Sequence, residues 1–159
     1  MTEKIYSQQE LTDAFRAAIE DRATWFYLLI KAAEKQGTDV EKMAEEAITE
    51  FGRIKGRAMG PAKDPGDFVV KLSTGHANKA FAMEIGEKSE KKGILKFRYC
   101  ALVEAWKKRG CSPEEVAKLC KLARCGDHGV VSCSPGLKLE FPHLLSEGDE
   151  YCELVVTKE

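Results

Sequence analysis

The sequence lacks several features that would assign it to a broad class of proteins. Its formal net charge is −1, so it carries no excess of positive charge that would attract a nucleic acid or an anionic membrane. Residues 1–10 contain no apolar segment of the kind found in secretory signals. The longest apolar run, at residues 25–30, is far too short to cross a bilayer. We therefore expect a cytoplasmic protein without membrane or nucleic-acid partners.

The sequence also lacks the C-x-x-C pairs that would define a zinc site, and it has no phosphate-loop motif. In a chain that we expect to be cytoplasmic, its six cysteines are predicted to be reduced thiols. The chain has 159 residues, of which 43% are apolar and 32% charged, which predicts a single globular domain over residues 1–159. We expect no cofactor.

Residues 1–60 are predicted to form a hairpin of two helices. Ser7 and Glu10 have the spacing of a capping box, a second capping box begins at Thr38, and Gly37 between them supplies the stop. The predicted apolar stripe of the first helix, interrupted by one polar residue, consists of Leu11, Phe15, Ala18, Arg22, Trp25, Leu29 and Ala32. Because aromatic residues recur on this stripe, the N-terminal helices also suit a homo-oligomer interface.

Glycines recur every four residues near the end of the second helix, at Gly52, Gly56 and Gly60. The simpler interpretation is a fraying helix end that packs closely against another element. The alternative is a ligand site in which the neighbouring Arg57 holds a carboxylate through its guanidinium.

Residues 67–159 are predicted to form the part of the protein that contains a sheet. Alternating apolar and polar residues predict two strands joined as a hairpin, then two later strands. The predicted strands cover residues 81–85, 95–99, 137–141 and 151–156. Between the second and third strands we expect a helix over residues 101–108 and another that starts at Ser112. The segment Cys125 to Gly129 is predicted to be a tight turn, and Pro142 is predicted to end the third strand.

These elements predict an α+β fold. An N-terminal helical hairpin is expected to pack on a four-stranded, mainly antiparallel sheet with two further helices.

The last quarter of the chain concentrates residues that can carry chemistry. Cys152 shares a strand face with Leu154 and Val156, so alternation predicts that its thiol points inward. Asp127 and His128 lie between glycines, where the aspartate could also serve only as a turn residue. A second chemical option is a metal held by three residues of this region, Cys125, His128 and Cys133.

Five segments of the chain together resemble the L-2-amino-thiazoline-4-carboxylic acid hydrolase family of small bacterial and archaeal proteins. They are Tyr99–Trp106, Gly110–Cys120, Gly126–Asp127, Leu137–Phe141 and Gly148–Cys152. The resemblance implies an α+β fold and the hydrolytic opening of a cyclic amidine, L-2-amino-thiazoline-4-carboxylate, to N-carbamoyl-L-cysteine.

This reaction needs attack at the carbon between nitrogen and sulfur, a proton for the leaving sulfur and a grip on the carboxylate. We expect Cys152 to be the nucleophile, Asp127 a general base and His128 the group that activates the thiol. The expected substrate contacts are Arg57 (or Arg98), Cys100 and His76. The alternative is a small-molecule binding or sensory module without turnover, which would be stabilised by a ligand that it does not consume.

Overall fold

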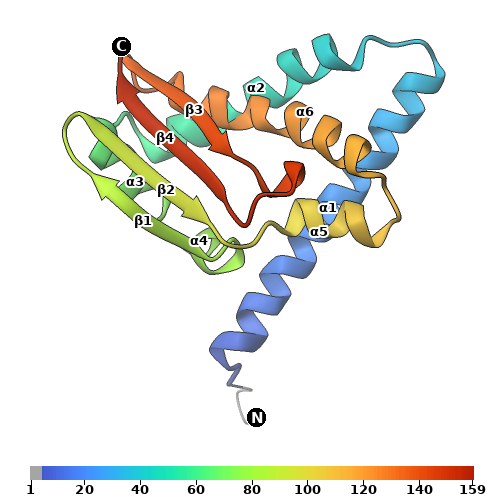
Figure 1. Cartoon of the computed structure of the whole chain (residues 1–159), viewed down its shortest axis with the longest axis horizontal. Helices are drawn as coiled ribbons and strands as arrows, with labels where there is room; N and C mark the ends of the chain where they lie inside the picture. Colours follow the sequence, from blue (N-terminus) through green and yellow to red (C-terminus); the bar gives the residue numbers. More distant parts are fainter. Residues whose placement is uncertain (1–4) are drawn as a thin grey trace.

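The computed structural model describes residues 5–159. The chain begins with the helical hairpin and then alternates helices and strands (Figure 1). The helices are α1 (Gln8–Lys35), α2 (Val40–Met59), α3 (Pro65–Leu72), α4 (Ala77–Ala80), α5 (Ala101–Lys108) and α6 (Pro113–Val131), with a short 3₁₀ helix η1 (Leu145–Glu147). The strands are β1 (Met83–Lys88), β2 (Lys92–Phe97), β3 (Leu137–His143) and β4 (Cys152–Lys158).

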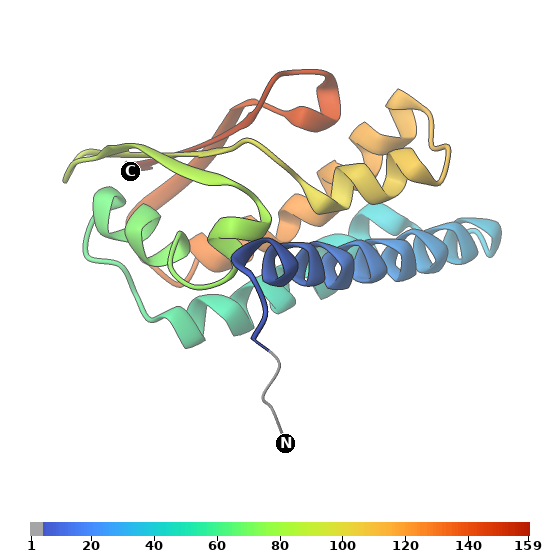
Figure 2. The ribbon, with the colours of Figure 1, turned by 90° about the horizontal axis from the view of Figure 1, so that it is seen from below.

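The four strands form one sheet in the order β1-β2-β4-β3, and every neighbouring pair is antiparallel. Figure 2 shows the helices gathered on one side of this sheet. The predicted α+β class with an N-terminal helical hairpin is therefore confirmed. The described residues contain four helices beyond the hairpin where two were expected, because residues 67–80, left unassigned in the sequence, form α3 and α4.

Two clusters of buried residues hold these layers together. One lies under the sheet and joins α3 and α6 to the inner faces of β2, β3 and β4, with Phe68, Leu95 and Leu154 at most 1% exposed. The other joins α1, α5 and α6 around Trp106, whose Nε1 donates a hydrogen bond to the Ala23 carbonyl at 3.0 Å. Apolar burial of this kind is the main stabilising contribution to the fold.

The helix starts follow the predicted capping rules with one exception. Capping boxes form at Ser7 and at Ser112 as expected. The predicted capping box at Thr38 is wrong, because Asp39 is the N-cap of α2 and accepts a hydrogen bond from the Lys42 backbone N–H. The N–H of Thr38 instead donates to the Ala33 carbonyl and closes the end of α1.

The buried face of α1 also differs from the predicted stripe. Ala23 and Ile30 are its fully buried residues, whereas Trp25 and Leu29 from the predicted stripe are 69% and 55% exposed. The prediction failed because α1 carries apolar residues around most of its circumference, so periodicity alone did not single out one face.

The predicted turn at residues 125–129 is wrong, because α6 continues through it to Val131. Gly129 of this segment and Gly52 of α2 serve helix packing: a Cβ atom on Gly129 would overlap the Thr49 carbonyl oxygen of α2, and one on Gly52 would overlap the Gly126 carbonyl oxygen. Close packing of α2 on α6 therefore explains glycine in both helices, and the close-packing interpretation of Gly52 is confirmed. Its companion expectation of a fraying helix end is wrong, since α2 runs unbroken to Met59.

Pro142 does not end the third strand, because β3 continues to His143. β3 is an edge strand, and its pairing with β4 shifts register between Glu140 and His143. An edge strand with an irregular register is where a proline, which has no N–H to donate, is tolerated.

Candidate functional site

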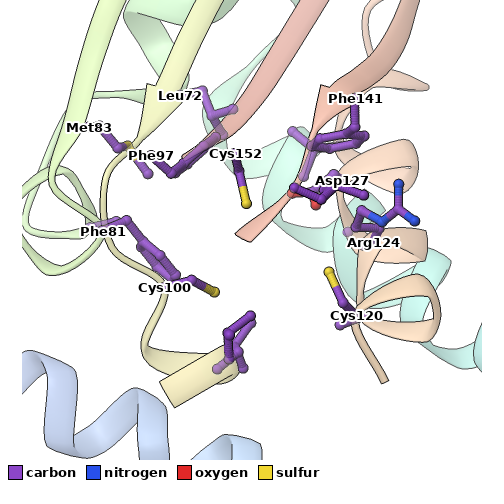
Figure 3. Close-up of a pocket in the computed structure, with 18 of the residues that line it drawn as sticks. Leu72, Phe81, Met83, Phe97, Cys100, Cys120, Arg124, Asp127, Phe141 and Cys152 are labelled. Carbon is purple, nitrogen blue, oxygen red and sulfur yellow. The ribbon is translucent and has the colours of Figure 1, made fainter. Parts of the chain in front are cut away.

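A cavity of about 220 Å³ lies between α6, α5 and the ends of β2 and β4 that face them (Figure 3). Most of its lining is apolar, and the side chains include Leu72, Phe81, Met83, Phe97, Trp106 and Phe141. Three thiols and four charged side chains complete it: Cys100, Cys120, Cys152, Arg22, Lys55, Arg124 and Asp127. The cavity thus joins an apolar interior to a few polar groups, which is the usual composition of a small-molecule site.

Asp127 is the acidic residue of the cavity. Because α6 continues past Gly126, the carboxyl group projects from a regular helix and points into the cavity, towards the side occupied by Cys152 (Figure 3). Burial raises the pKa of Asp127 to about 6, against the opposing effect of the positive charges of Lys55 and Arg124. A carboxyl group with this pKa is mostly ionised at neutral pH and can still exchange a proton there.

Cys152 is the first residue of β4 and lies opposite Phe97 of β2. Leu154 and Val156, on the same strand face, are buried, so the inward orientation predicted by alternation is confirmed. The Cys152 Sγ accepts a hydrogen bond from the Leu145 backbone N–H at 3.3 Å. This contact lowers the thiol pKa, but burial outweighs it and raises the pKa of Cys152 to about 11.

The other two thiols of the cavity are also protonated at neutral pH. Cys100 occupies the N-cap position of α5, and burial raises its pKa to about 12. Burial likewise raises the pKa of Cys120 on α6. All six cysteines are free, and the cavity therefore presents three neutral thiols rather than a thiolate.

Three cations line the same cavity: Arg22 from α1, Lys55 from α2 and Arg124 from α6. The Cζ of Arg22 and the Nζ of Lys55 lie 5.8 and 4.8 Å from the Phe51 ring centre. Burial and the positive charge of Arg22 lower the pKa of Lys55, whereas the negative charge of Asp127 raises it. The Cζ of Arg124 lies 5.3 Å from the Phe141 ring centre. Its Nε is buried without a hydrogen-bond partner in the described part of the chain.

The structure brings together only part of the predicted site. Cys152, Asp127 and Cys100 line one cavity. His128 does not line it but lines a separate groove with Glu45 and Cys125, with its ring centre 6.2 Å from that of Phe141.

The remaining two predicted substrate contacts also lie outside the cavity lining. His76 is exposed and stacks on Phe15 with 4.7 Å between ring centres. Arg57 is exposed and forms an ion pair with Glu50 at 2.7 Å. Arg98, the alternative to Arg57, pairs with Glu84 at 3.1 Å.

The suggested metal ligands do not converge. Cys133 contacts the Arg53 and Gly129 carbonyls, and Cys125 the Lys121 carbonyl. Within residues 5–159, no group of three or more His, Cys, Asp or Glu side chains has the arrangement of a metal site.

Sequence reasoning did not propose Arg22, Lys55 or Arg124. A usable signal existed for two of them. Arg22 is the one polar residue in the apolar stripe of α1, and Lys55 stands between the two packing glycines Gly52 and Gly56. Nothing in the sequence around Arg124 distinguishes it from other basic residues of α6.

The fold and the cavity define an α+β protein with a small, mostly apolar cavity lined by three thiols. The L-2-amino-thiazoline-4-carboxylic acid hydrolase family model matches residues 16–156. The chain therefore belongs to this family. No curated protein matches the chain.

Among solved structures, the chain resembles a trafficking protein particle complex subunit 3 from Naegleria fowleri, in a crystal structure in which that subunit is covalently bound to palmitic acid. The TM-score is 0.58 with 12% sequence identity, and the match covers 88% of this chain and 94% of that chain. At this identity the likeness concerns the fold. Separately, none of the helices in residues 5–159 is both long and apolar enough to cross a membrane.

Proposed function

We propose that the protein is a cytoplasmic hydrolase that opens a small cyclic amidine carboxylate such as L-2-amino-thiazoline-4-carboxylate, with Asp127 as the general base. The observation that carries this proposal is the Asp127 carboxyl group, which points into an apolar cavity and has a pKa raised to about 6. A general base is most effective when its pKa lies near the working pH. Membership of the hydrolase family supports the reaction class.

The size of the cavity supports a ligand with one small ring. An apolar protein cavity of about 150 Å³ is enough to bind benzene, and drug-sized ligands occupy roughly 300–1,000 Å³. A cavity of about 220 Å³ lies between these values. It suits a five-membered ring with a carboxylate and an amino group better than a large substrate.

In the proposed reaction, Asp127 accepts a proton from a water molecule while the oxygen of that water attacks the carbon between the ring nitrogen and the sulfur. The bond from that carbon to sulfur then breaks, and the sulfur takes the proton back from Asp127. The second proton of the water passes from the new hydroxyl group to the ring nitrogen, and the carbon becomes the carbonyl of the urea group, which gives N-carbamoyl-L-cysteine. Asp127 ends in its starting state, and one water molecule is consumed.

Cys152 faces the same space but is a weaker candidate for the initial attack. Its pKa of about 11 lies about five units above that of Asp127, so moving its proton to Asp127 costs about 7 kcal/mol. We therefore propose that Cys152 contacts the ring and that water is the nucleophile. His128, His76 and Arg57 do not line the cavity, and the proposal assigns them no step.

The test is turnover of L-2-amino-thiazoline-4-carboxylate by the native protein, Asp127→Asn and Cys152→Ala, with the product followed by mass spectrometry. We expect product from the native protein and Cys152→Ala, and about 10²–10⁴ times less from Asp127→Asn. If Cys152→Ala alone gave no product, the nucleophile would be the thiol of Cys152 and not water. An absence of product from the native protein would reject the named reaction.

A second function is favoured by the neutral thiols and the apolar lining: a small-molecule binding module without turnover. Three protonated thiols among aromatic side chains are better suited to binding an apolar ligand than to acting as a charged catalytic centre. The structurally similar subunit from Naegleria fowleri is covalently bound to palmitic acid. The intact mass of the purified protein tests this alternative, because an acyl adduct on a cavity thiol would favour binding over hydrolysis.

A further inference from the structure

The cavity contains more positive charge than its own acidic group can neutralise. Arg22, Lys55 and Arg124 line it, whereas Asp127 is its one acidic residue among residues 5–159. At neutral pH the three cavity thiols are uncharged because their pKa values are raised. An ionised Asp127 therefore leaves a local excess of two positive charges.

The three cations of the cavity form no ion pair within residues 5–159. About half of the other lysines and arginines in that part of the chain do, for example Arg57 with Glu50 and Lys108 with Glu20. No carboxylate lies within ion-pair distance of Arg22, Lys55 or Arg124 in that part of the chain. Their charges are thus available to a ligand.

Arg22 and Lys55 lie together at the mouth of the cavity. Both residues are exposed to solvent and both line the cavity. Both charged groups contact Phe51, with 5.8 Å from the Arg22 Cζ and 4.8 Å from the Lys55 Nζ to the ring centre. Partial desolvation lowers the pKa of both side chains, and the positive charge of Arg22 lowers the pKa of Lys55 further. A bound anion would relieve both penalties.

We propose that Arg22 and Lys55 form a subsite for the carboxylate of the ligand. An Arg guanidinium suits a carboxylate because it can donate two parallel hydrogen bonds, and Lys adds a second positive charge. A carboxylate held there would leave the rest of a compact ligand inside the apolar cavity, beside Asp127 and Cys152. The ligand class is thus a small apolar ring that carries one carboxylate.

This inference rests on the cavity used in the proposed function, but it does not need turnover. The test measures the binding of two matched pairs of probes by nuclear magnetic resonance titration. One pair is L-2-amino-thiazoline-4-carboxylate and its carboxamide; the other is benzoate and benzamide. The first pair is titrated against Asp127→Asn alone and combined with Arg22→Gln or Lys55→Gln, so that hydrolysis does not consume the acid. The second pair is titrated against the native protein, Arg22→Gln and Lys55→Gln.

We expect the acid of at least one pair to bind at least tenfold more tightly than its amide, and each substitution to remove most of this preference. Arg57→Gln, at an exposed arginine outside the cavity, is the matched control and should keep the preference. Equal binding of acid and amide, no binding of either acid, or an unchanged preference in both variants would overturn the subsite. A preference in the benzoate pair alone would keep the subsite and reject the named substrate.

Discussion

Asp127→Asn should stabilise the protein above pH 6. The substitution keeps the shape of the side chain and removes a group that must ionise inside an apolar cavity. Burial raises the pKa of Asp127 from 3.8 to about 6, a shift of about two units, and each unit corresponds to about 1.4 kcal/mol. The folded state of the native protein is therefore destabilised by about 3 kcal/mol once Asp127 is ionised in both states.

The sign of this effect sets its pH dependence. Between pH 4 and 6 the folded protein holds a proton on Asp127 that the unfolded chain has already lost, so the contribution of Asp127 to stability falls as pH rises through this range. Above pH 6 the loss is complete. The difference in unfolding free energy between variant and native protein should thus grow from pH 4 to about 6 and then stay constant.

Urea denaturation at a series of pH values measures this difference directly. At pH 8 the variant should be about 3 kcal/mol more stable, which corresponds to a rise of roughly 6–12 °C in Tm for a chain of this size. Asp21→Asn, at an exposed residue of α1, controls for the loss of a surface charge. A variant that is less stable than the native protein at pH 8 would refute the reasoning, because Asp127 would then be a stabilising ionised group.

Three further predictions concern the thiols, the helix packing and the assembly. Cys152 should react slowly with iodoacetamide at pH 7, and its rate should rise about tenfold per pH unit towards its pKa of about 11; fast labelling at pH 7 would contradict a neutral thiol. Gly129→Ala should destabilise the protein by about 3 kcal/mol or more in urea denaturation, whereas Gly126→Ala, whose Cβ would lie 3.5 Å from Ile48, should be tolerated; equal effects would refute the packing argument. The expected homo-oligomer through the N-terminal helices stays a prediction: light scattering should detect it in the native protein and not in Trp25→Glu, where Trp25 is 69% exposed, and a monomeric native protein would contradict it.

Local sequence rules predicted the parts of the fold that depend on neighbouring residues. The capping boxes at Ser7 and Ser112 form because the serine hydroxyl and the carboxylate three residues later each accept a hydrogen bond from the backbone N–H of the other residue. The inward orientation of Cys152 followed from strand alternation alone. The family was also recognisable, since the motifs between Tyr99 and Cys152 lie within the matched residues 16–156.

The remaining features depend on contacts between distant segments. Gly129 looks like a turn residue until α2 is packed on α6, where Gly129 and Gly52 allow the two backbones to meet. Pro142 is compatible with a strand only because β3 lies at the edge of the sheet. Arg22 lines the cavity because α1 and α2 come together there, with Arg22 beside Phe51. No local sequence pattern predicts that contact between the two helices.

The pH dependence of kcat/KM for L-2-amino-thiazoline-4-carboxylate tests the central claim most directly. If Asp127 is the general base, kcat/KM should rise with pH through about 6, the pKa of Asp127, and then level off, and Asp127→Asn should lose both this rise and most of the activity. A rise that begins only above pH 8, set by a thiol, or a native protein without turnover at any pH, would contradict the account.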